Sequence, residues 1–226
     1  MRQIVIFAAL RMEIADLRKR LRLLREAKIA GLRIYRGNFR GVEVILVLTG
    51  VGRGRSRLAA NRILAEIQPW AIINLGTAGA LSADLQTGQA LLPEAICSEE
   101  GAEVRLANID LDGSDGVRRG RLLTVKRGVN GSRMRGELRA KYRVDAVDME
   151  ACEIAQIAEE QGMAFYCLKV ISDDAGGCAR LTYFWNLLKA RRIIGECGEK
   201  LLETLTTGIK TGEDKIGSSL FCMGND

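Results

Sequence analysis

The sequence predicts a single α/β domain, with a central, largely buried sheet that is covered by helices. Four apolar runs rich in Val, Ile and Leu have the length and composition of buried strands, at residues 3–10, 42–48, 70–75 and 164–171. Stretches with helical periodicity lie between and after these runs, at 13–25, 55–67, 150–161 and 183–206. Strands that alternate with helices are typical of a sheet enclosed by helices.

The length of 226 residues fits one α/β domain. Residues 79–126 are richer in Gly and Asp, but they include two short strand-like pieces, at 89–96 and 121–125. We expect both pieces to join the same sheet, so that residues 1–207 form one domain. After Thr206 the chain becomes polar and rich in glycine, which predicts a flexible tail over 208–226.

The first apolar run is short, and Arg11 and Glu13 follow it at once, where a signal peptide would need small residues. No segment has the length of unbroken apolar sequence that a membrane span requires. The six cysteines form no Cys-x-x-Cys pair, and three of them sit in apolar stretches. We therefore expect reduced, mostly buried thiols in a cytoplasmic protein.

The formal net charge of +6 comes mainly from arginines, which cluster at 18–25, 53–57 and 118–127. A basic chain can bind nucleic acid through its phosphates. Here the arginines mostly alternate with apolar residues, and no aromatic side chains are interleaved with them for base stacking. This pattern favours solvated protein faces, and we expect no nucleic-acid partner.

The chain contains no histidine, which restricts the chemistry that it can perform. Nucleophilic mechanisms based on Ser-His or Cys-His pairs are excluded. The cysteines lack the spacing of a zinc site, so we expect no metal and no cofactor. Carboxylates are the leading candidates for acid–base catalysis.

Polar residues occur where four of the expected strands end, at 11–13, 76–79, 148–150 and 172–174. In open α/β sheets, ligands bind at the carboxyl ends of the strands. Each segment also has a purely structural interpretation: a first-turn helix acid, a turn, a capping cluster begun by Asp148, and a solvated loop. Similarly, glycines 50, 52 and 54 suggest a phosphate loop only weakly, and a tight turn between strand and helix explains them better.

The order of these segments resembles a known family, the methylthioadenosine/S-adenosylhomocysteine nucleosidases and purine nucleoside phosphorylases. The resemblance covers residues 3–205 and rests on five motifs, in this order: Ala9-Leu10-Arg11-Met12-Glu13, Thr49-Gly50-Val51-Gly52, Ile73-Asn74-Leu75-Gly76-Thr77-Ala78-Gly79, Val147-Asp148-Met149-Glu150-Ala151 and Ile171-Ser172-Asp173. It implies a central mixed, twisted sheet with helices on both faces, and a homo-oligomer, most simply a dimer.

The resemblance also implies an activity, the cleavage of the bond between base and sugar in an adenosyl-type purine nucleoside. Asp173 is expected to be the general acid at the base, oriented by Ser172, and Glu13 the group that activates water. Met149 and Glu150 are expected to bind the ribose, where the Glu150 carboxylate would stabilise an electron-poor ribosyl cation. The remaining substrate-binding residues are expected to be Thr77, Gly79 and Val129.

Some positions depart from the family pattern. Gly128 stands where many nucleosidases carry an aromatic residue that stacks on the base, so stacking is either missing or supplied by Tyr142 or by another chain. The phosphorylases bind phosphate with two arginines, and here Met12 and Asn74 hold those positions. Arg11 is shifted by one residue, a rotation of roughly 100° on a helix. Water is therefore the expected nucleophile.

Three alternatives stay open at the level of sequence. The reaction can be phosphorolytic, and the substrate can be an adenosyl-lipid, since the motifs around Glu13 and Glu150 also resemble the hopanoid-associated phosphorylase-like branch. The third is a nucleoside-binding protein without catalysis, because a fold does not fix a function. The simultaneous presence of Glu13, Glu150 and Asp173 argues against the third.

Overall fold

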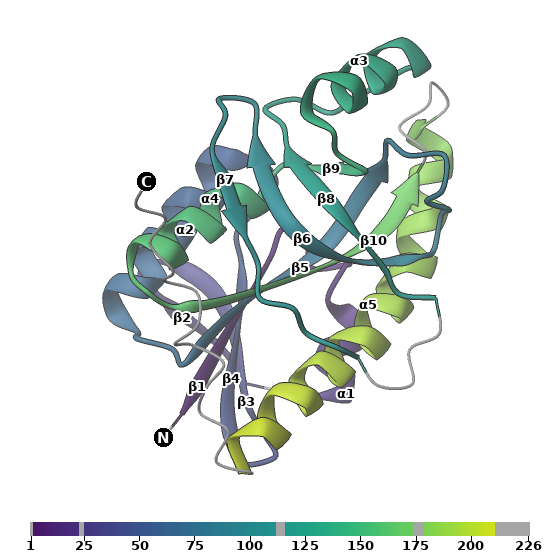
Figure 1. Ribbon diagram of the computed structural model, residues 1–226. Coiled ribbons are helices and arrows are strands. Elements are labelled where there is room, and N and C mark those ends of the chain that lie inside the picture. The colour runs from purple at the N-terminus through teal and green to yellow at the C-terminus, as the bar shows by residue number, and fades with distance from the viewer. Residues whose placement is uncertain (1, 23–24, 112–115, 174–178, 211–226) are drawn as a thin grey trace.

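A computed structural model describes residues 2–22, 25–111, 116–173 and 179–210 (Figure 1). Its ten strands form one mixed sheet, which confirms the expected architecture. The strands are β1 (Gln3–Ala8), β2 (Arg25–Ile29), β3 (Leu32–Phe39), β4 (Val42–Leu48), β5 (Ala71–Ala80), β6 (Ala90–Ser98), β7 (Glu103–Arg105), β8 (Arg118–Thr124), β9 (Ala146–Asp148) and β10 (Ala164–Asp173).

The sheet closes partly on itself, so the site does not lie at the edge of a fully open sheet. Its strand order is β10-β6-β8-β9-β5-β1-β4-β3-β2, and β10 pairs a second time, with β5. This second pairing completes a ring of five strands, β5, β10, β6, β8 and β9. The two strand-like pieces expected at 89–96 and 121–125 are β6 and β8, and both belong to this ring.

Helices cover both faces of the sheet, as expected. Strand β1 shows why, because its side chains alternate between two hydrophobic clusters: Val5 and Phe7 enter one, and Ile4 and Ile6 the other. The first cluster packs under α2 (Arg53–Glu66) and α4 (Ala151–Glu160). The second packs under α1 (Ala15–Arg20) and α5 (Ala179–Lys210).

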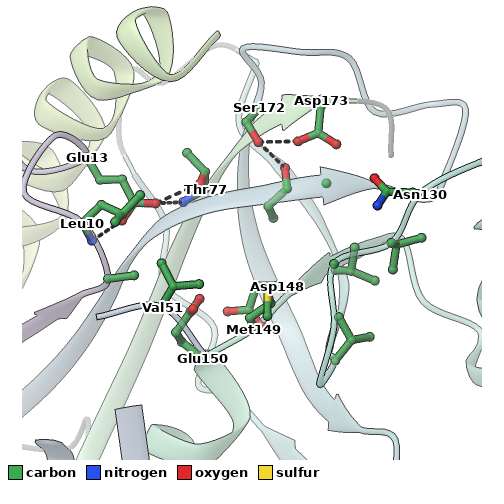
Figure 2. Close-up of a pocket in the computed structure, with 17 residues that line it drawn as sticks. Leu10, Glu13, Val51, Thr77, Asn130, Asp148, Met149, Glu150, Ser172 and Asp173 are labelled. Atoms are coloured by element: carbon green, nitrogen blue, oxygen red, sulfur yellow. Dashed lines mark hydrogen bonds between the residues drawn. The ribbon is translucent and has the colours of Figure 1, made fainter. Parts of the chain in front are cut away.

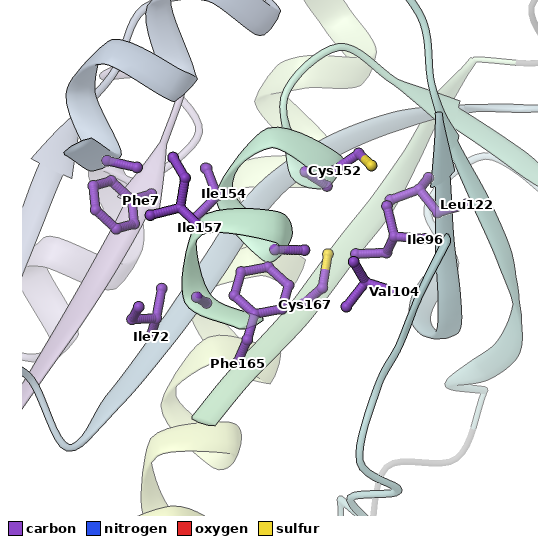
Figure 3. Close-up of a cluster of buried hydrophobic side chains, with 14 of the residues drawn as sticks. Phe7, Ile72, Ile96, Val104, Leu122, Cys152, Ile154, Ile157, Phe165 and Cys167 are labelled. Atoms are coloured by element: carbon purple, nitrogen blue, oxygen red, sulfur yellow. The ribbon is translucent and has the colours of Figure 1, made fainter. Parts of the chain in front are cut away.

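The cluster under α4 holds the ring to the rest of the sheet (Figure 3). Ile154 and Ile157 of α4 are fully or almost fully buried, and they lie in one cluster with Phe7 of β1 and Ile96 of β6. Burial of a large aliphatic side chain contributes about 1.5–3 kcal/mol. The start of α4, which carries Glu150, is therefore fixed against both halves of the sheet.

The helix expected over 13–25 is wrong at both ends. Residues 11–14 form turns, α1 spans only Ala15–Arg20, and β2 begins at Arg25. Strands β2 and β3 form a hairpin whose turn residues Ala30 and Gly31 both have positive φ, 49° and 79°. Such a two-residue turn matches the twist of paired strands. The alternating charged and apolar residues of this region had imitated a helical pattern.

Two other elements differ from expectation. Segment 76–79 is the second half of β5 and not a turn, while residues 172–173 end β10 and are not a loop. The short strand β9 and the helix α3 (Ser132–Tyr142) were not expected, and no residue of α3 is buried. A third hydrophobic cluster lies beneath α3, where Leu138 and Tyr142 pack against it.

Four of the six cysteines lie in the described residues, and all four are free thiols, as expected. Cys97, Cys152 and Cys167 are buried, and burial raises the pKa of both Cys152 and Cys167 to about 12. Cys178 and Cys222 lie outside the described residues, as does the expected tail beyond Lys210. None of the described helices is long and apolar enough to span a membrane.

Candidate active site

A cavity of about 260 Å³ opens where the ends of β1, β5, β9 and β10 meet. Four carboxylates line it, together with mainly small and apolar residues (Figure 2). No lysine or arginine is among its lining residues in the described part of the chain, and no group of three potential metal ligands occurs there. The lining residues are Ala9, Leu10, Glu13, Val51, Thr77, Ala78, Gly79, Val125, Gly128, Val129, Asn130, Val147, Asp148, Met149, Glu150, Ser172 and Asp173.

Glu13 is held in one orientation by three hydrogen bonds (Figure 2). Its Oε2 accepts from the Leu10 N–H at 2.9 Å. Its Oε1 accepts from the backbone N–H of Thr77 at 3.0 Å and from the Thr77 hydroxyl at 2.8 Å. The side chain is only 3% exposed, yet it lines the cavity. An ionised carboxylate, which only accepts hydrogen bonds, suits these three donors.

Gly76 allows Glu13 to come close to β5. A Cβ atom at this position would lie 3.2 Å from Glu13 Oε1 and 3.6 Å from Lys169 Nζ. The first distance is shorter than ordinary van der Waals contact, so a side chain here would displace the carboxylate. The glycine in this motif is therefore explained by the site and not by a turn.

Below the cavity, Lys169 of β10 forms a buried ion pair with Asp148 of β9. The two groups are 2.8 Å apart, and their side chains are 2% and 0% exposed. Asp148 also accepts hydrogen bonds from the Thr124 hydroxyl at 2.6 Å and the Ala151 N–H at 2.9 Å. Asp148 thus caps α4 through its side chain, although the helix starts at Ala151 and not near Met149.

The ion pair governs the charge state of Lys169. Burial alone would lower the pKa of Lys169, but the carboxylate of Asp148 and the neighbouring acid Glu150 raise it above its ordinary value. Lys169 is therefore a permanent cation beneath four carboxylates. The sequence contained a signal for it that we had not used, because a lysine in the otherwise apolar run 164–171 needs a buried partner.

Glu150 has the most altered acidity among the pocket carboxylates. Burial raises its pKa to about 7, and the charge of Asp148 adds to this effect. Lys169 and a hydrogen bond from the Gly52 N–H act in the opposite direction. That hydrogen bond is 2.7 Å long and ends on Oε1 of Glu150. Glu150 can therefore exchange a proton near neutral pH.

The glycine loop before α2 serves this carboxylate. Gly50 and Gly52 have φ values of 78° and 104°, which favour glycine, and Gly52 is the N-cap of α2. The loop is thus the tight turn between strand and helix that the sequence favoured. Arg53 and Glu153, joined at 2.6 Å, bring the starts of α2 and α4 together, and this contact keeps the Gly52 N–H beside Glu150.

Ser172 orients Asp173 at the end of β10. The serine hydroxyl donates to Oδ2 of Asp173 at 2.7 Å, and it also lies 3.4 Å from the Ala78 carbonyl oxygen (Figure 2). A register shift in the pairing of β10 with β5 falls between Ile171 and Asp173. Irregular pairing of this kind re-aims side chains at the end of a strand.

All eight residues expected at the site line this one cavity, while their roles stay predictions. They are Glu13, Thr77, Gly79, Val129, Met149, Glu150, Ser172 and Asp173. The fourth polar segment, 172–174, includes Asp174, which lies outside the described residues. Besides Lys169, the sequence had not pointed to Gly52 as a hydrogen-bond donor to the site.

The residues considered for phosphate binding and base stacking are not among the lining residues. Arg11 is exposed, and Met12 is partly exposed in the turn before α1. Asn74 is buried and donates to the Phe7 carbonyl oxygen at 3.1 Å. Tyr142 packs in the cluster beneath α3 and donates to the Glu99 carbonyl oxygen at 3.2 Å. Gly128 does line the cavity, so the stacking position has no side chain.

A mixed sheet that closes into a ring, with carboxylates converging on a small apolar cavity, defines an α/β protein built to hold a small polar molecule. The family comparison makes this specific. A family model described as the phosphorylase superfamily matches residues 3–110 and 111–206. The chain belongs to the phosphorylase superfamily.

Solved structures share the fold at low sequence identity. A futalosine hydrolase mutant of Helicobacter pylori has a TM-score of 0.82 and 17% identity, covering 90% of this chain and 99% of that chain. The 5'-methylthioadenosine/S-adenosylhomocysteine nucleosidase of Neisseria meningitidis, in complex with methylthio-immucillin-A, has a TM-score of 0.82 and 21% identity, with the same coverage. A mutant nucleosidase of Helicobacter pylori, with 5'-methylthioadenosine in its active site, has a TM-score of 0.81 and 18% identity, again covering 90% and 99%.

The buried ion pair leads to a prediction about stability. Lys169→Met leaves Asp148 buried without its counter-ion, so we expect the free energy of unfolding to fall by ~3–5 kcal/mol. In the double variant Lys169→Met/Asp148→Asn the uncompensated charge is gone, and part of the loss should return. Chemical denaturation measures both. A single variant as stable as the wild type would show that the pair does not hold the ring together.

The raised pKa of Glu150 leads to a prediction about pH. Between pH 4.5, its ordinary pKa, and about 7, the folded protein keeps a proton that the unfolded chain has released. Stability therefore falls as pH rises through this window, by up to about 3 kcal/mol, and changes no further above it. Glu150→Gln removes this dependence while the amide can still accept from Gly52.

The measurement is the free energy of unfolding of wild type and Glu150→Gln at a series of pH values. Glu137→Gln, which removes an exposed carboxylate from α3, is the matched control. The difference between wild type and Glu150→Gln should change with pH, and the difference for the control should not. Parallel curves for wild type and Glu150→Gln would contradict the assignment.

Proposed function

We propose that this protein hydrolyses the N-glycosidic bond of an adenosyl-type purine nucleoside. The observation that carries the proposal is the convergence of Glu13, Glu150 and Asp173 on one cavity whose described lining contains no cation. Acidic groups on several sides of a bound nucleoside suit a reaction in which the sugar becomes positively charged. Membership of the phosphorylase superfamily and the fold shared with nucleosidases support the same chemistry.

Glu13 is proposed to activate the water. Its two oxygens are held by donors from Leu10 and Thr77, so the carboxylate cannot swing away when a water molecule binds. Each carboxylate oxygen can accept more than one hydrogen bond, which leaves capacity to take a proton from water. A base fixed in this way needs little reorganisation during the reaction.

Glu150 and Met149 are proposed to bind the ribose. The Glu150 carboxyl group can hydrogen-bond the sugar hydroxyls, and its negative charge would stabilise the ribosyl cation as the bond to the base breaks. A pKa of about 7 allows Glu150 to shed its proton when a cation develops beside it. Lys169 supplies a fixed countercharge from below without occupying the cavity.

Asp173 is proposed to protonate or hydrogen-bond the purine ring as the base leaves. The Ser172 hydroxyl holds one of its oxygens at 2.7 Å and so fixes the direction of the carboxyl group. Gly79 and Val129 would contact the nucleoside, and with Gly128 at the stacking position the cavity leaves room for the base. The base would then be held by Asp173 and apolar contacts.

Water is preferred to phosphate as the nucleophile because a phosphate dianion needs cationic partners in a partly dry site. Asn74, at one of the family's phosphate positions, uses its amide within the sheet, and Met12, at the other, is uncharged. Arg11 is exposed and absent from the cavity lining. Glu13, when ionised, would repel phosphate.

The nucleophile is decided by kinetics with adenosine-type nucleosides. We expect release of free base at a rate that does not depend on phosphate, together with a free reducing sugar. Chromatography of base and sugar products, with and without phosphate, measures both. Ribose-1-phosphate, or a rate that saturates with phosphate, would establish phosphorolysis, and Arg11→Ala would then be the first variant to test.

Asp173→Asn tests the acid. The substitution keeps the shape of the side chain but removes its proton, so we expect turnover to fall by ~10²-fold or more while binding and folding persist. Ser172→Ala should have a smaller effect, because it removes only the group that orients Asp173. Product formation and nucleoside binding are measured side by side. Activity of Asp173→Asn close to wild type would remove Asp173 from this role.

The alternatives differ in the same assays. A non-catalytic binding protein would bind the nucleoside and release no base under any condition. An adenosyl-lipid substrate would be cleaved where soluble nucleosides are not. The described structure places no residue that favours either alternative over hydrolysis, and the set of three carboxylates favours catalysis.

A homodimer is part of the proposal. Val51 and Leu58 are 41% and 50% exposed, and they lie at the start and on the surface of α2. Exposed large apolar side chains often mark contacts with another chain. Two-fold dimers are the commonest closed assembly. Contact between two copies at α2 would also enclose the side of the cavity that Val51 lines.

A further inference from the structure

The helix α3 and the loop before it carry a strong positive charge. We define the α3 basic surface as the cationic residues between 126 and 143, which are Lys126, Arg127, Arg133, Arg135, Arg139, Lys141 and Arg143. Glu137 is the one acid in this stretch, so the stretch has a formal charge of +6. The whole chain also has a net charge of +6, and the remaining residues are therefore balanced.

This surface is exposed to solvent. No residue of α3 is buried, and Figure 1 shows the helix at the rim of the molecule, beyond the ends of β8 and β9. Leu138 and Tyr142 face the protein and pack against the third hydrophobic cluster. Arg133, Arg139 and Lys141 are exposed. The helix thus has an inner apolar side and an outer cationic side.

Nearby acids neutralise the surface only in part. Lys126 pairs with Glu100 at 2.6 Å, Arg133 with Glu137 at 2.9 Å, and Arg139 approaches Asp84 at 4.0 Å. Exposed pairs of this kind are weak and exchange readily with other partners. Among the described residues, Arg127 and Arg143 have no ion pair. The surface therefore remains available to an anionic partner.

We propose that the α3 basic surface binds the anionic surface of a lipid membrane. A cluster of four to eight Lys and Arg residues on a helix is attracted to anionic headgroups. Met134 lies among these cations and is 46% exposed, which makes it one of three exposed large hydrophobic residues in the described chain. An exposed apolar side chain beside cations suits the boundary between headgroups and acyl chains.

A nucleic acid fits this surface less well. Recognition of single strands relies on aromatic side chains that stack on bases. Tyr142 is the aromatic residue of α3, and its ring packs inward while its hydroxyl donates to the Glu99 carbonyl oxygen. Met134 would remain in water when phosphates bind the arginines. The combination of charge and exposed apolar side chain therefore favours lipid.

Binding in this way would place the cavity close to the membrane. Gly128, Val129 and Asn130 line the cavity, and α3 begins two residues later, at Ser132. The bound protein would thus hold its cavity beside the lipid headgroups. This inference does not depend on the proposed hydrolysis, because it concerns a surface outside the catalytic groups.

The test is flotation of the full chain with vesicles rich in phosphatidylglycerol, compared with vesicles of phosphatidylcholine alone. We expect binding to the anionic vesicles only, and weaker binding as salt is raised. The variant Arg133→Gln/Arg139→Gln/Lys141→Gln should bind about 100-fold more weakly, since each cation contributes about fivefold. Met134→Ser, which keeps every charge, should also weaken binding.

The matched control removes three exposed cations elsewhere, at Arg25 and Lys28 of β2 and Arg62 of α2. This variant has the same net charge as the α3 variant and should bind anionic vesicles like the wild type. Equal losses in the two variants would show that total charge acts and not α3. Absence of vesicle binding, with or without binding to duplex DNA or single-stranded RNA, would overturn the proposal. Base release from a soluble nucleoside should be unchanged in both variants.

Discussion

The buried ion pair between Lys169 and Asp148 is the interaction on which the rest of the site depends. It joins β10 to β9, and Asp148 also binds Thr124 of β8 and the first N–H of α4. Three strands of the ring and one helix therefore meet at a single carboxylate. A buried charge is stable only when paired and hydrogen-bonded, so these elements are constrained to one arrangement.

The same pair explains how the cavity can be acidic without a cation in its described lining. Lys169 offsets the carboxylates from beneath, while Glu13 and Glu150 are held by N–H groups of Thr77, Leu10 and Gly52. Backbone donors stabilise negative charge without filling the cavity. The result is a negative, mostly apolar space, which would favour a positively charged sugar over an anionic nucleophile.

Local patterns predicted well where a single periodicity dominates. The apolar run at 42–48 is β4 itself, and the helix expected over 150–161 differs from α4 by one residue at each end. They failed at 25–39, where alternating charges are compatible with both helix and strand and the Ala30–Gly31 turn decides. They also missed α3, since a helix without buried residues has no apolar stripe to detect.

The sequence by itself determined the sheet, the helices on both faces and the eight residues of the candidate site, because strand periodicity and the order of the motifs are properties of the chain. Only the tertiary structure decided that β10 closes the ring with β5, that Lys169 neutralises Asp148, and that Gly52 donates to Glu150 across 98 positions. Such contacts join residues far apart in sequence, and their strength comes from burial, which exists only once the sheet and helices have packed.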